Sequence, residues 1–428
     1  MHPLAARLLA NLAPLRNAPT WYIAYSGGLD STVLLHLLAS LAREQALPRL
    51  VALHVHHGLQ MPADAWPAHC SRICHGLGVP LQVLRVTVEP GASLEQGARN
   101  ARYGAFSRCL QPDELLLTAQ HRDDQAETLL FRLLRGAGVR GLAGMPAQRR
   151  LGAGWLVRPL LDCPRSALLE YAQAQQLDWV EDPSNADTGL SRNYLRHTVL
   201  PSVHARWPQA SAALARSAGH LGEALELLDS LAEEDLQAAR SPAPFAWLPL
   251  PSLALAPLRA LSPARQRNAL QHWLAAFTRL PDSRHWAGWD ALRDAPDPAN
   301  AVWRLTDGEL RAGAGRIWWL AGPWLQVPGA PSGGLLPGNG QVEWQGPPGS
   351  QAAEVRYRQG GESIDVPGRG QRDLKRLLNE SGLPSFVRSR LPLLFCDGRL
   401  QAVANLPSLC QSGWQMKWMP PTNAQCLS

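Results

Sequence analysis

Short apolar runs alternate with amphipathic stretches over residues 1–200 of the 428-residue chain. The apolar runs have the length of β-strands, and the stretches between them show helical spacing of their apolar residues. The expected strands are Trp21–Tyr25, Leu50–Val55, Leu81–Val86 and Glu114–Ala119, and the expected helices are Ser31–Arg43, Asp64–Leu77, Ser93–Cys109 and one after Asp123. This alternation predicts an α/β fold with a doubly wound, mostly parallel sheet, which binds ligands at the carboxyl ends of its strands.

A glycine-containing turn, Ser26-Gly27-Gly28-Leu29-Asp30-Ser31, follows the first expected strand. Its glycines let the backbone approach a ligand closely, and the free N–H groups at the start of the next helix attract an anion. The serine hydroxyls add donors, and the Asp30 carboxylate suits a Mg²⁺ ion that bridges phosphates. No lysine follows, so this is not the Gly-x-x-x-x-Gly-Lys phosphate loop. An ordinary tight turn with an N-cap is the alternative, which the flanking strand and helix disfavour.

A second group of candidate site residues follows the fourth expected strand: His121, Asp123, Asp124 and Glu127. Asp124 and Glu127 are three residues apart and therefore share a helix face. Such acids bind a metal or a cationic substrate, and His121 suits contact with a phosphate or an attacking group. A helix N-cap with acidic first-turn residues is the alternative, and it explains two acids but not a histidine with three acids. We expect this segment beside the glycine-containing turn.

Arginine provides most of the positive charge of the chain, whose net charge is +6 and whose only lysines are Lys375 and Lys417. Residues 131–161 contain arginines but no acid, whereas a solvated surface normally mixes both signs. Arginine grips phosphates with a bidentate fork, so the stretch favours a polyanionic partner. An arginine-biased codon usage is the alternative explanation for the choice of arginine. The arginines expected to contact the polyanion here are Arg135, Arg140, Arg192 and Arg196.

Composition divides the chain into four expected segments. Residues 1–207 hold the alternating pattern, and residues 208–321 are mainly helical, with a long helix or helical hairpin expected over Ala210–Arg240. Residues 322–350 are rich in glycine and proline and are expected to be a linker. Residues 351–428 are expected to form a small α+β module.

Cysteine usage and hydropathy indicate the compartment. The seven cysteines do not form a disulfide framework, and Cys70 and Cys74 are expected to be buried structural thiols. No signal peptide and no apolar run of membrane-spanning length is evident. We therefore expect a soluble cytoplasmic protein that does not associate with membranes.

Five segments together resemble the N-type ATP pyrophosphatases of the PP-loop superfamily, and among them the tRNA(Ile)-lysidine synthetase family. They are Ser26–Ser31, His56-His57-Gly58-Leu59, Glu95–Tyr103, Gln120–Gly144, and Asp182–Asn185 with Arg192, Asn193 and Arg196. The phosphate-binding turn is shared by many adenylating enzymes, whereas the later elements in this order are much more specific. Gln120 departs from the pattern, because a second histidine often occupies that position in the family.

The resemblance implies an ATP-dependent ligase. ATP adenylates the wobble cytidine in the CAU anticodon of tRNA(Ile) and releases pyrophosphate, and the side-chain amine of free L-lysine then displaces AMP to form lysidine. In this scheme the segment Ser26, Gly27, Gly28, Leu29, Asp30 and Ser31 binds ATP, and Asp30 holds Mg²⁺. Asp124 and Glu127 grip the lysine ammonium, and His121 lies near the reacting centre, so that the expected catalytic residues are Asp30, His121, Asp124 and Glu127.

The C-terminal module resembles that of the same family at Leu374–Leu378 and Arg388–Leu393. A local basic cluster in it is expected to bind the tRNA acceptor stem: Arg369, Arg372, Lys375, Arg376, Arg388 and Arg390. The resemblance also implies that residues 1–207 form the ATP-pyrophosphatase catalytic domain and that the helical residues 208–321 bind tRNA. It covers most of the chain and is weakest over this helical middle.

Two other classes of protein are the alternatives. Another PP-loop tRNA-modifying adenylating enzyme, such as a thiolase, is expected to have a Cys-x-x-Cys pair or a catalytic cysteine, and no such pair occurs. A non-catalytic RNA-binding protein that senses ATP would not need Asp30, His121, Asp124 and Glu127 together. The oligomeric state is left open, a homodimer included.

Overall fold

The computed structural model describes residues 1–58, 64–88, 94–281, 284–295, 301–332, 334–348, 353–366 and 369–423. These residues form two compact units, 1–226 and 227–428. Leu59 of the His-His-Gly-Leu element, Ser93 at the expected start of a helix, and the expected boundary at residues 350 and 351 lie outside the described residues.

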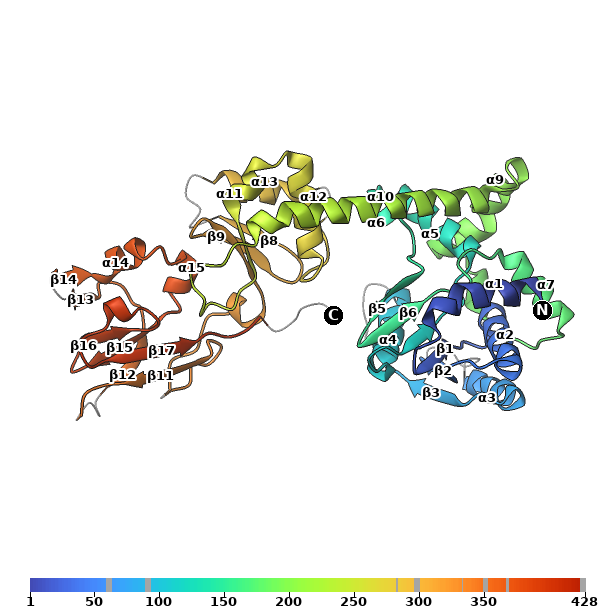
Figure 1. The fold of residues 1–428 in the computed structure, drawn as a ribbon, viewed down its shortest axis with the longest axis horizontal. Helices are drawn as coiled ribbons and strands as arrows, with labels where there is room; N and C mark the ends of the chain where they lie inside the picture. The colour runs from blue at the N-terminus through green and yellow to red at the C-terminus, as the bar shows by residue number, and fades with distance from the viewer. Residues whose placement is uncertain are drawn as a thin grey trace. The chain divides into compact units, whose positions relative to one another are not determined.

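A six-stranded sheet forms the centre of the N-terminal unit (Figure 1). Its strands, in spatial order, are β3 (Leu81–Arg85), β2 (Arg49–His56), β1 (Thr20–Ala24), β4 (Leu115–Leu117), β6 (Gly154–Val157) and β5 (Gln148–Leu151). All neighbouring strands pair in parallel except β5, which is antiparallel to β6. The predicted doubly wound, mostly parallel sheet is therefore confirmed, and the β5–β6 hairpin adds an edge that was not predicted.

Helices cover both faces of this sheet, because side chains alternate along each strand. Trp21 and Ile23 of β1 enter the core shared with α1, α2, α3 and α7, whereas Tyr22 packs with α4 on the other face. The helices are α1 (Pro3–Leu12), α2 (Leu29–Glu44), α3 (Trp66–Leu77), α4 (Leu94–Cys109), α5 (Arg122–Leu134), α6 (Val139–Leu142), α7 (Arg165–Ala174), α8 (Ser191–Tyr194) and α9 (Leu200–Arg206), with the short turns η1 (Ala13–Leu15), η3 (Pro183–Ala186) and the π-helical η4 (Leu195–Val199).

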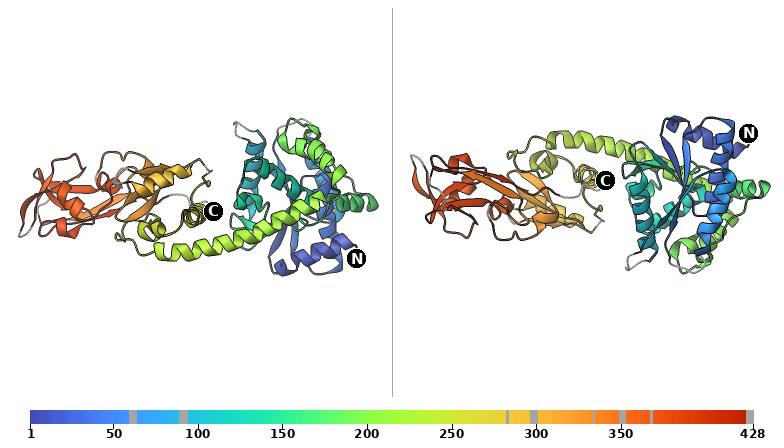
Figure 2. Two further views of the ribbon diagram at one scale, coloured as in Figure 1. Left: turned by 90° about the horizontal axis from the view of Figure 1, so that it is seen from above. Right: turned by 90° about the horizontal axis from the view of Figure 1, so that it is seen from below.

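The long helix expected after residue 208 is present as α10 (Ala210–Ala239), a single uninterrupted helix (Figure 2). The helices α11 (Leu255–Ala260), α12 (Pro263–Leu274) and α13 (Trp286–Asp294) then pack on a four-stranded antiparallel sheet. Its strands, in spatial order, are β7 (Ser252–Ala254), β10 (Arg316–Leu320), β9 (Glu309–Gly313) and β8 (Val302–Arg304). The helices of this region agree with the prediction from the sequence, whereas its sheet was not predicted.

The rest of the second unit is built from short strands and two short helices around one core. β11 (Gln341–Gln345) falls in the stretch expected to be a linker, and it pairs with β17 (Gln415–Met419). The other elements are η5 (Gly322–Leu325), β12 (Glu354–Tyr357), β13 (Ser363–Val366), β14 (Gly370–Asp373), α14 (Leu374–Glu380), α15 (Ser385–Arg388), β15 (Pro392–Cys396), β16 (Arg399–Val403) and η6 (Pro407–Leu409). Over the described residues, no helix has the length and apolar content needed to cross a membrane.

Candidate active site

The turn Ser26–Ser31 joins β1 to α2 at the carboxyl edge of the sheet. Gly27 has a φ of +86°, a conformation that favours glycine, and a Cβ at this position would make a tight contact of 3.1 Å with the Cys70 sulfur. The Ser26 and Ser31 hydroxyls lie 3.0 Å apart, and Ser31 Oγ donates to the Gly28 carbonyl at 3.0 Å. No side chain caps α2, so N–H groups at its start are available to an anionic ligand.

A backbone hydrogen bond from a distant segment also holds this turn. The carbonyl of Gly27 accepts a hydrogen bond from the Val180 N–H at 2.9 Å. Val180 leads into the Asp182–Asn185 element, where the Asp182 side chain accepts from the Ser184 N–H at 2.9 Å. Asn193 Nδ2 in turn donates to the Ser184 carbonyl at 2.9 Å. The Asp-Pro-Ser-Asn element therefore connects the phosphate-binding turn to α8.

His121 is the N-cap of α5, and its side chain is only 1% exposed. Its Nδ1 accepts from the Asp124 N–H, and the Asp124 carboxylate accepts from the His121 N–H, which forms a capping box. His121 Nε2 lies 3.7 Å from Asp30 Oδ2 and 3.4 Å from Asp124 Oδ2. Burial opposes protonation, but the carboxylates of Asp30 and Asp124 overcome it and raise the pKa of His121. His121 thus links the start of α5 to the start of α2, because it lies between Asp124 and Asp30.

Asp30 has one carboxylate oxygen without a hydrogen-bond partner. This oxygen, Oδ1, is buried, and its nearest described cation is Arg165 Nε at 3.8 Å. Burial alone would raise the pKa of Asp30, but His121 and Arg165 lower it, so the carboxylate is charged. Mg²⁺ usually binds one or two carboxylates together with substrate phosphates, so a single free Asp30 oxygen beside the turn fits this ion. Among the described residues, no cluster of three or more side chains forms a metal cage of protein ligands alone.

Asp124 and Glu127 share one face of α5, as predicted, and two arginines face them. Glu127 is 2% exposed and accepts from Arg192 Nε at 3.0 Å and from Arg196 Nε at 2.6 Å. Asp124 Oδ1 lies 3.3 Å from Arg192 Nη2 and 3.1 Å from Arg196 Nη2. Although burial opposes it, Glu127 and Asp124 raise the pKa of Arg196. The four side chains form an ion network, and a buried carboxylate requires such partners.

This network bears on two predictions from the sequence. Asp124 and Glu127 were expected to bind lysine, and Arg192 and Arg196 were expected to bind tRNA, but their mutual pairing was not foreseen. Arg192 lies on α8, and Arg196 lies on the π-helical η4, a geometry frequent at functional sites. Both assignments stay predictions, and any ligand of these residues has to share their charges with the network.

The other expected arginines near α5 are held in different ways. The side chain of Arg135 is exposed and stacks over the Phe131 ring at 5.1 Å, and Arg140 lies on α6. Arg132, which was not among the expected site residues, donates to the carbonyls of Gly141 and Gly144 at 2.7 and 2.8 Å. The glycine-rich loop after α5 is therefore fastened to α5 by Arg132.

The basic cluster of the C-terminal module is only partly available to RNA. Arg372 and Lys375 are exposed, whereas Arg376 pairs with Glu380 at 3.1 Å and Arg388 donates to the Leu383 carbonyl at 2.6 Å. The nearby Arg390 is buried and donates to four backbone carbonyls, those of Pro323, Trp324, Gln326 and Gly338. The expectation that Arg390 belongs to the RNA-binding cluster is therefore corrected: its guanidinium is part of the core.

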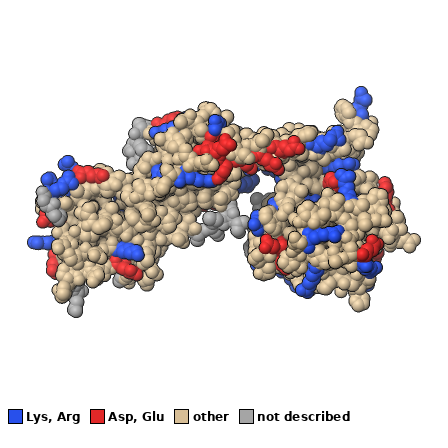
Figure 3. All heavy atoms as spheres, in the orientation of Figure 1, with Lys and Arg blue, Asp and Glu red and all other residues tan. Residues whose placement is uncertain are grey.

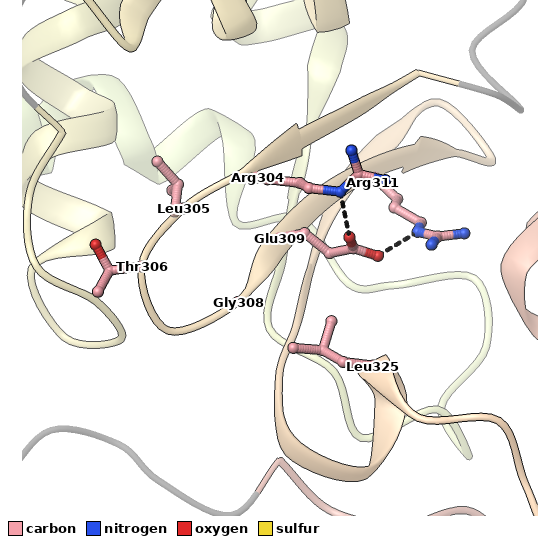
Figure 4. A pocket seen from close by; sticks show the side chains of 7 residues that line it. All are labelled: Arg304, Leu305, Thr306, Gly308, Glu309, Arg311 and Leu325. Atoms are coloured by element: carbon pink, nitrogen blue, oxygen red, sulfur yellow. Dashed lines mark hydrogen bonds and ion pairs between the residues drawn. The ribbon is translucent and has the colours of Figure 1, made fainter.

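A polar hollow of about 400 Å³ lies in the second unit, outside all the expected site residues (Figure 4). The side chains of Arg304 and Arg311 point toward Glu309, which lies 3.9 Å from Arg304 Nε and 2.6 Å from Arg311 Nε. The lining residues are Arg304, Leu305, Thr306, Gly308, Glu309, Arg311 and Leu325. Because both arginines face one buried acid, part of their charge is neutralised within the hollow.

Comparison with known families assigns consecutive parts of the chain. The PP-loop domain matches residues 1–203, the TilS substrate binding domain matches residues 253–318, and the TilS substrate C-terminal domain matches residues 353–418. The tRNA(Ile)-lysidine synthase of Pseudomonas putida is 63% identical over 98% of this chain and 100% of its own length. The chain belongs to the tRNA(Ile)-lysidine synthase family.

Other members of the tRNA(Ile)-lysidine synthase family match over nearly the whole chain as well. The synthase of Pseudomonas aeruginosa is 59% identical over 100% of this chain and 99% of its own length. That of Alkalilimnicola ehrlichii is 45% identical over 93% of this chain and 92% of its own length. The resemblance found in the sequence is confirmed, and the N-terminal unit contains the ATP-binding PP-loop domain of this ligase family.

Proposed function

We propose that the chain forms lysidine in two steps: it adenylates the wobble cytidine in the CAU anticodon of tRNA(Ile) with ATP, and it then attaches free L-lysine. The observation that supports this most directly is the meeting of two helix starts. His121 at the start of α5 lies 3.7 Å from Asp30 at the start of α2, and the Asp124–Glu127 face is on the same helix as His121. A phosphate-binding turn thus lies next to paired acids.

In the first step, the ring carbonyl oxygen of the cytidine bonds to the α-phosphorus of ATP, and the bond between the α- and β-phosphates breaks. The N–H groups at the start of α2 and the hydroxyls of Ser26 and Ser31 stabilise the pyrophosphate that leaves. A bound Mg²⁺ would neutralise charge between phosphate oxygens, with Asp30 as its protein ligand. Arg165, close to Asp30, adds a positive charge at the same place.

In the second step, the side-chain amine of lysine bonds to the activated ring carbon, the carbon–oxygen bond breaks, and AMP leaves. The amine must lose a proton, and His121, held between Asp30 and Asp124, is placed to hold or pass it. Free lysine also carries an α-ammonium and an α-carboxylate. Since Asp124 and Glu127 already contact two guanidiniums, we infer that lysine binds by sharing charges within this network and not in a vacant acidic pocket.

The test is incorporation of labelled lysine into an isoleucine tRNA with a CAU anticodon, in the presence of ATP. The proposal expects labelled RNA and one pyrophosphate released for each lysine attached. The same tRNA with a different wobble base is the matched control and should stay unlabelled. If no lysine is incorporated while another substrate drives pyrophosphate release, a different PP-loop modification is the correct function.

The swap Asp124→Asn tests the lysine site within this scheme. We expect a strong loss of lysine-dependent turnover with ATP binding largely intact. Asp124 Oδ1 pairs with both arginines of the ion network, whereas Asp124 Oδ2 contacts His121, so the hydrogen bonds within the phosphate-binding turn are unchanged. Asp123→Asn is the comparison variant. Asp123 also lies near His121, at 3.9 Å, but it accepts from the Arg165 N–H at 2.8 Å and is not part of the ion network, so it tests the effect of an acid outside that network. Loss of ATP binding in Asp124→Asn would instead assign this residue to the metal site.

The exposed Arg372 and Lys375 are proposed to contact tRNA from the C-terminal module. A homodimer stays an untested expectation, for which sedimentation of the full chain is the direct measurement.

A further inference from the structure

Three arginines from different elements meet around one tyrosine in the N-terminal unit. Arg99 and Tyr103 lie one turn apart on α4, and the Arg99 guanidinium lies 4.9 Å from the Tyr103 ring centroid. Arg149 reaches the same ring from β5, at 5.2 Å. Arg158, directly after β6, interacts with the Tyr103 phenol. Tyr103 therefore orients two guanidiniums by cation–π contact and adjoins a third.

Arg158 is the buried member of this group, with 4% of its surface exposed. Its Nη1 donates to the Pro146 carbonyl at 2.6 Å, but its buried Nε has no hydrogen-bond partner. Burial lowers the pKa of Arg158, and the like charges of Arg149 and Arg99 lower it further, against the opposing effect of Tyr103. Keeping three positive charges this close is costly unless an anion joins them.

Carboxylates neutralise arginines elsewhere in the chain. On α10, for example, Asp235 pairs with Arg265 and Glu233 pairs with Arg240, and acidic side chains gather over this helix in the space-filling view (Figure 3). Among the described residues, neither Arg99 nor Arg149 nor Arg158 is ion-paired with a carboxylate. The positive charge around Tyr103 is thus left for a ligand.

We propose that Arg99, Arg149 and Arg158 around Tyr103 form a binding site for a backbone phosphate of the RNA substrate. This inference rests on the proposed function, which makes an RNA the substrate. The group lies at the carboxyl edge of the sheet, the edge that also holds the phosphate-binding turn, because Arg158 follows the end of β6 and Arg149 is at the start of β5. RNA bound there would follow the same edge of the sheet as the phosphate-binding turn.

ATP is not the source of this phosphate. In the sheet order, β5 is three strands away from β1, which precedes the phosphate-binding turn. At about 4.8 Å per strand, roughly 14 Å separate the two strands. Phosphates held by the turn cannot reach Arg149 over this distance, whereas the backbone of a tRNA can.

The sequence offers a matched pair of variants, Arg149→Gln and Arg150→Gln. The two arginines are adjacent on β5, so their side chains point to opposite faces of the sheet. Arg149 lies on the α4 face with Tyr103, and Arg150 stacks over Trp155 at 3.9 Å on the other. Each substitution removes one positive charge, and the two differ only in the face of the sheet from which the charge is removed.

The readout is the dissociation constant of the full chain for tRNA(Ile), measured by fluorescence anisotropy over a salt series without ATP and lysine. We expect Arg149→Gln to weaken binding about 5- to 10-fold and to reduce the slope of log K against log salt by roughly 0.7 to 0.9, the loss of one phosphate contact. Arg150→Gln should bind as the unchanged chain does, and Arg149→Lys should restore most of the salt slope. Tyr103→Leu should weaken binding through its loss of orientation of both guanidiniums.

Equal tRNA affinity of the Arg149→Gln and Arg150→Gln variants would overturn the proposal. So would a loss of ATP affinity in Arg149→Gln with tRNA binding unchanged, because the site would then serve the nucleotide. Urea unfolding of both variants shows that a difference in binding is not a difference in folding. Because binding is measured without the ligase reaction, failure of lysine incorporation would reject the proposed function separately.

Discussion

Glu127→Gln is the substitution that tests the ion network most directly. Glu127 is 2% exposed and accepts three hydrogen bonds from charged donors: Arg192 Nε at 3.0 Å, Arg196 Nε at 2.6 Å and Arg196 Nη2 at 2.9 Å. Glutamine keeps the volume but removes the charge and replaces one acceptor by an NH₂ group that faces a guanidinium. Two arginines would then share Asp124 as their remaining counter-ion.

The expected loss of stability depends on how deeply Glu127 and its two arginine partners are buried. Removing one partner of a buried ion pair costs about 3–5 kcal/mol. The arginine side chains are 36% and 30% exposed, so solvent screening lowers this to about 2–3 kcal/mol. Urea unfolding followed by circular dichroism, fitted with separate transitions for the two units, measures the change.

The matched control for this substitution is Glu233→Gln on α10. Glu233 also pairs with an arginine, Arg240, but its side chain is 46% exposed, and exposed ion pairs contribute about 0–1 kcal/mol. Equal destabilisation by the two substitutions would refute the argument from burial. The lysine reaction supplies a second readout: we expect KM for lysine to rise at least tenfold in Glu127→Gln, with the Kd for ATP unchanged within about twofold. An unchanged KM would remove Glu127 from the lysine site.

Three further predictions follow from local geometry. Gly27→Ala should destabilise the N-terminal unit by about 1–2 kcal/mol in urea unfolding, because φ is +86° and the new Cβ would lie 3.1 Å from the Cys70 sulfur. Gly28→Ala is the control and should lower the free energy of unfolding by less, because φ of Gly28 is −76°. Burial and nearby positive charges lower the pKa of His57 from 6.5 to about 4. Between these pH values the unfolded chain binds a proton at His57 and the folded chain does not, so the free energy of unfolding should fall by about 1–2 kcal/mol as the pH drops from 6.5 to 4. His57→Gln should abolish this loss. Arg390→Met should destabilise the second unit by about 3 kcal/mol or more without changing ATP affinity, since it leaves buried carbonyls unpaired, and a wild-type unfolding curve would contradict the structural role of this guanidinium.

The first four strands of the N-terminal unit and the helices that follow them could be predicted from the sequence because their signals are local, whereas α1, α7 and the β5–β6 hairpin were not predicted. The expected strand Leu81–Val86 is β3 (Leu81–Arg85), and the expected strand Leu50–Val55 lies within β2 (Arg49–His56). The four-stranded sheet of the second unit could not be predicted in this way. Its strands β7 and β8 have three residues each, and β7 pairs with β10 through partners such as Ser252 and Trp318, which are far apart in the sequence.

The residues of the candidate site were predicted from the sequence, but the ion pairs between its acids and arginines were not. Asp30, His121 and Asp124 meet as expected, because the carboxyl ends of parallel strands share one edge of the sheet. The partners of Glu127 lie 65 and 69 residues further along the chain, and no local pattern links such distant charges. The segment Glu95–Tyr103 was matched to the family from the sequence, but no local pattern predicts that Arg149 and Arg158 meet Tyr103.

Arginine shows most clearly why charge counting fails as a guide to a binding surface. A run of arginines without acids suggests a polyanion, but the fold then determines what each guanidinium meets. Arg196 meets two carboxylates and Arg390 meets four carbonyls, so neither is available as a free charge. Arg149 and Arg158 meet an aromatic ring and other positive charges. An RNA surface on this chain should therefore be sought where guanidiniums lack a counter-ion in the fold, and not where arginines are most frequent in the sequence.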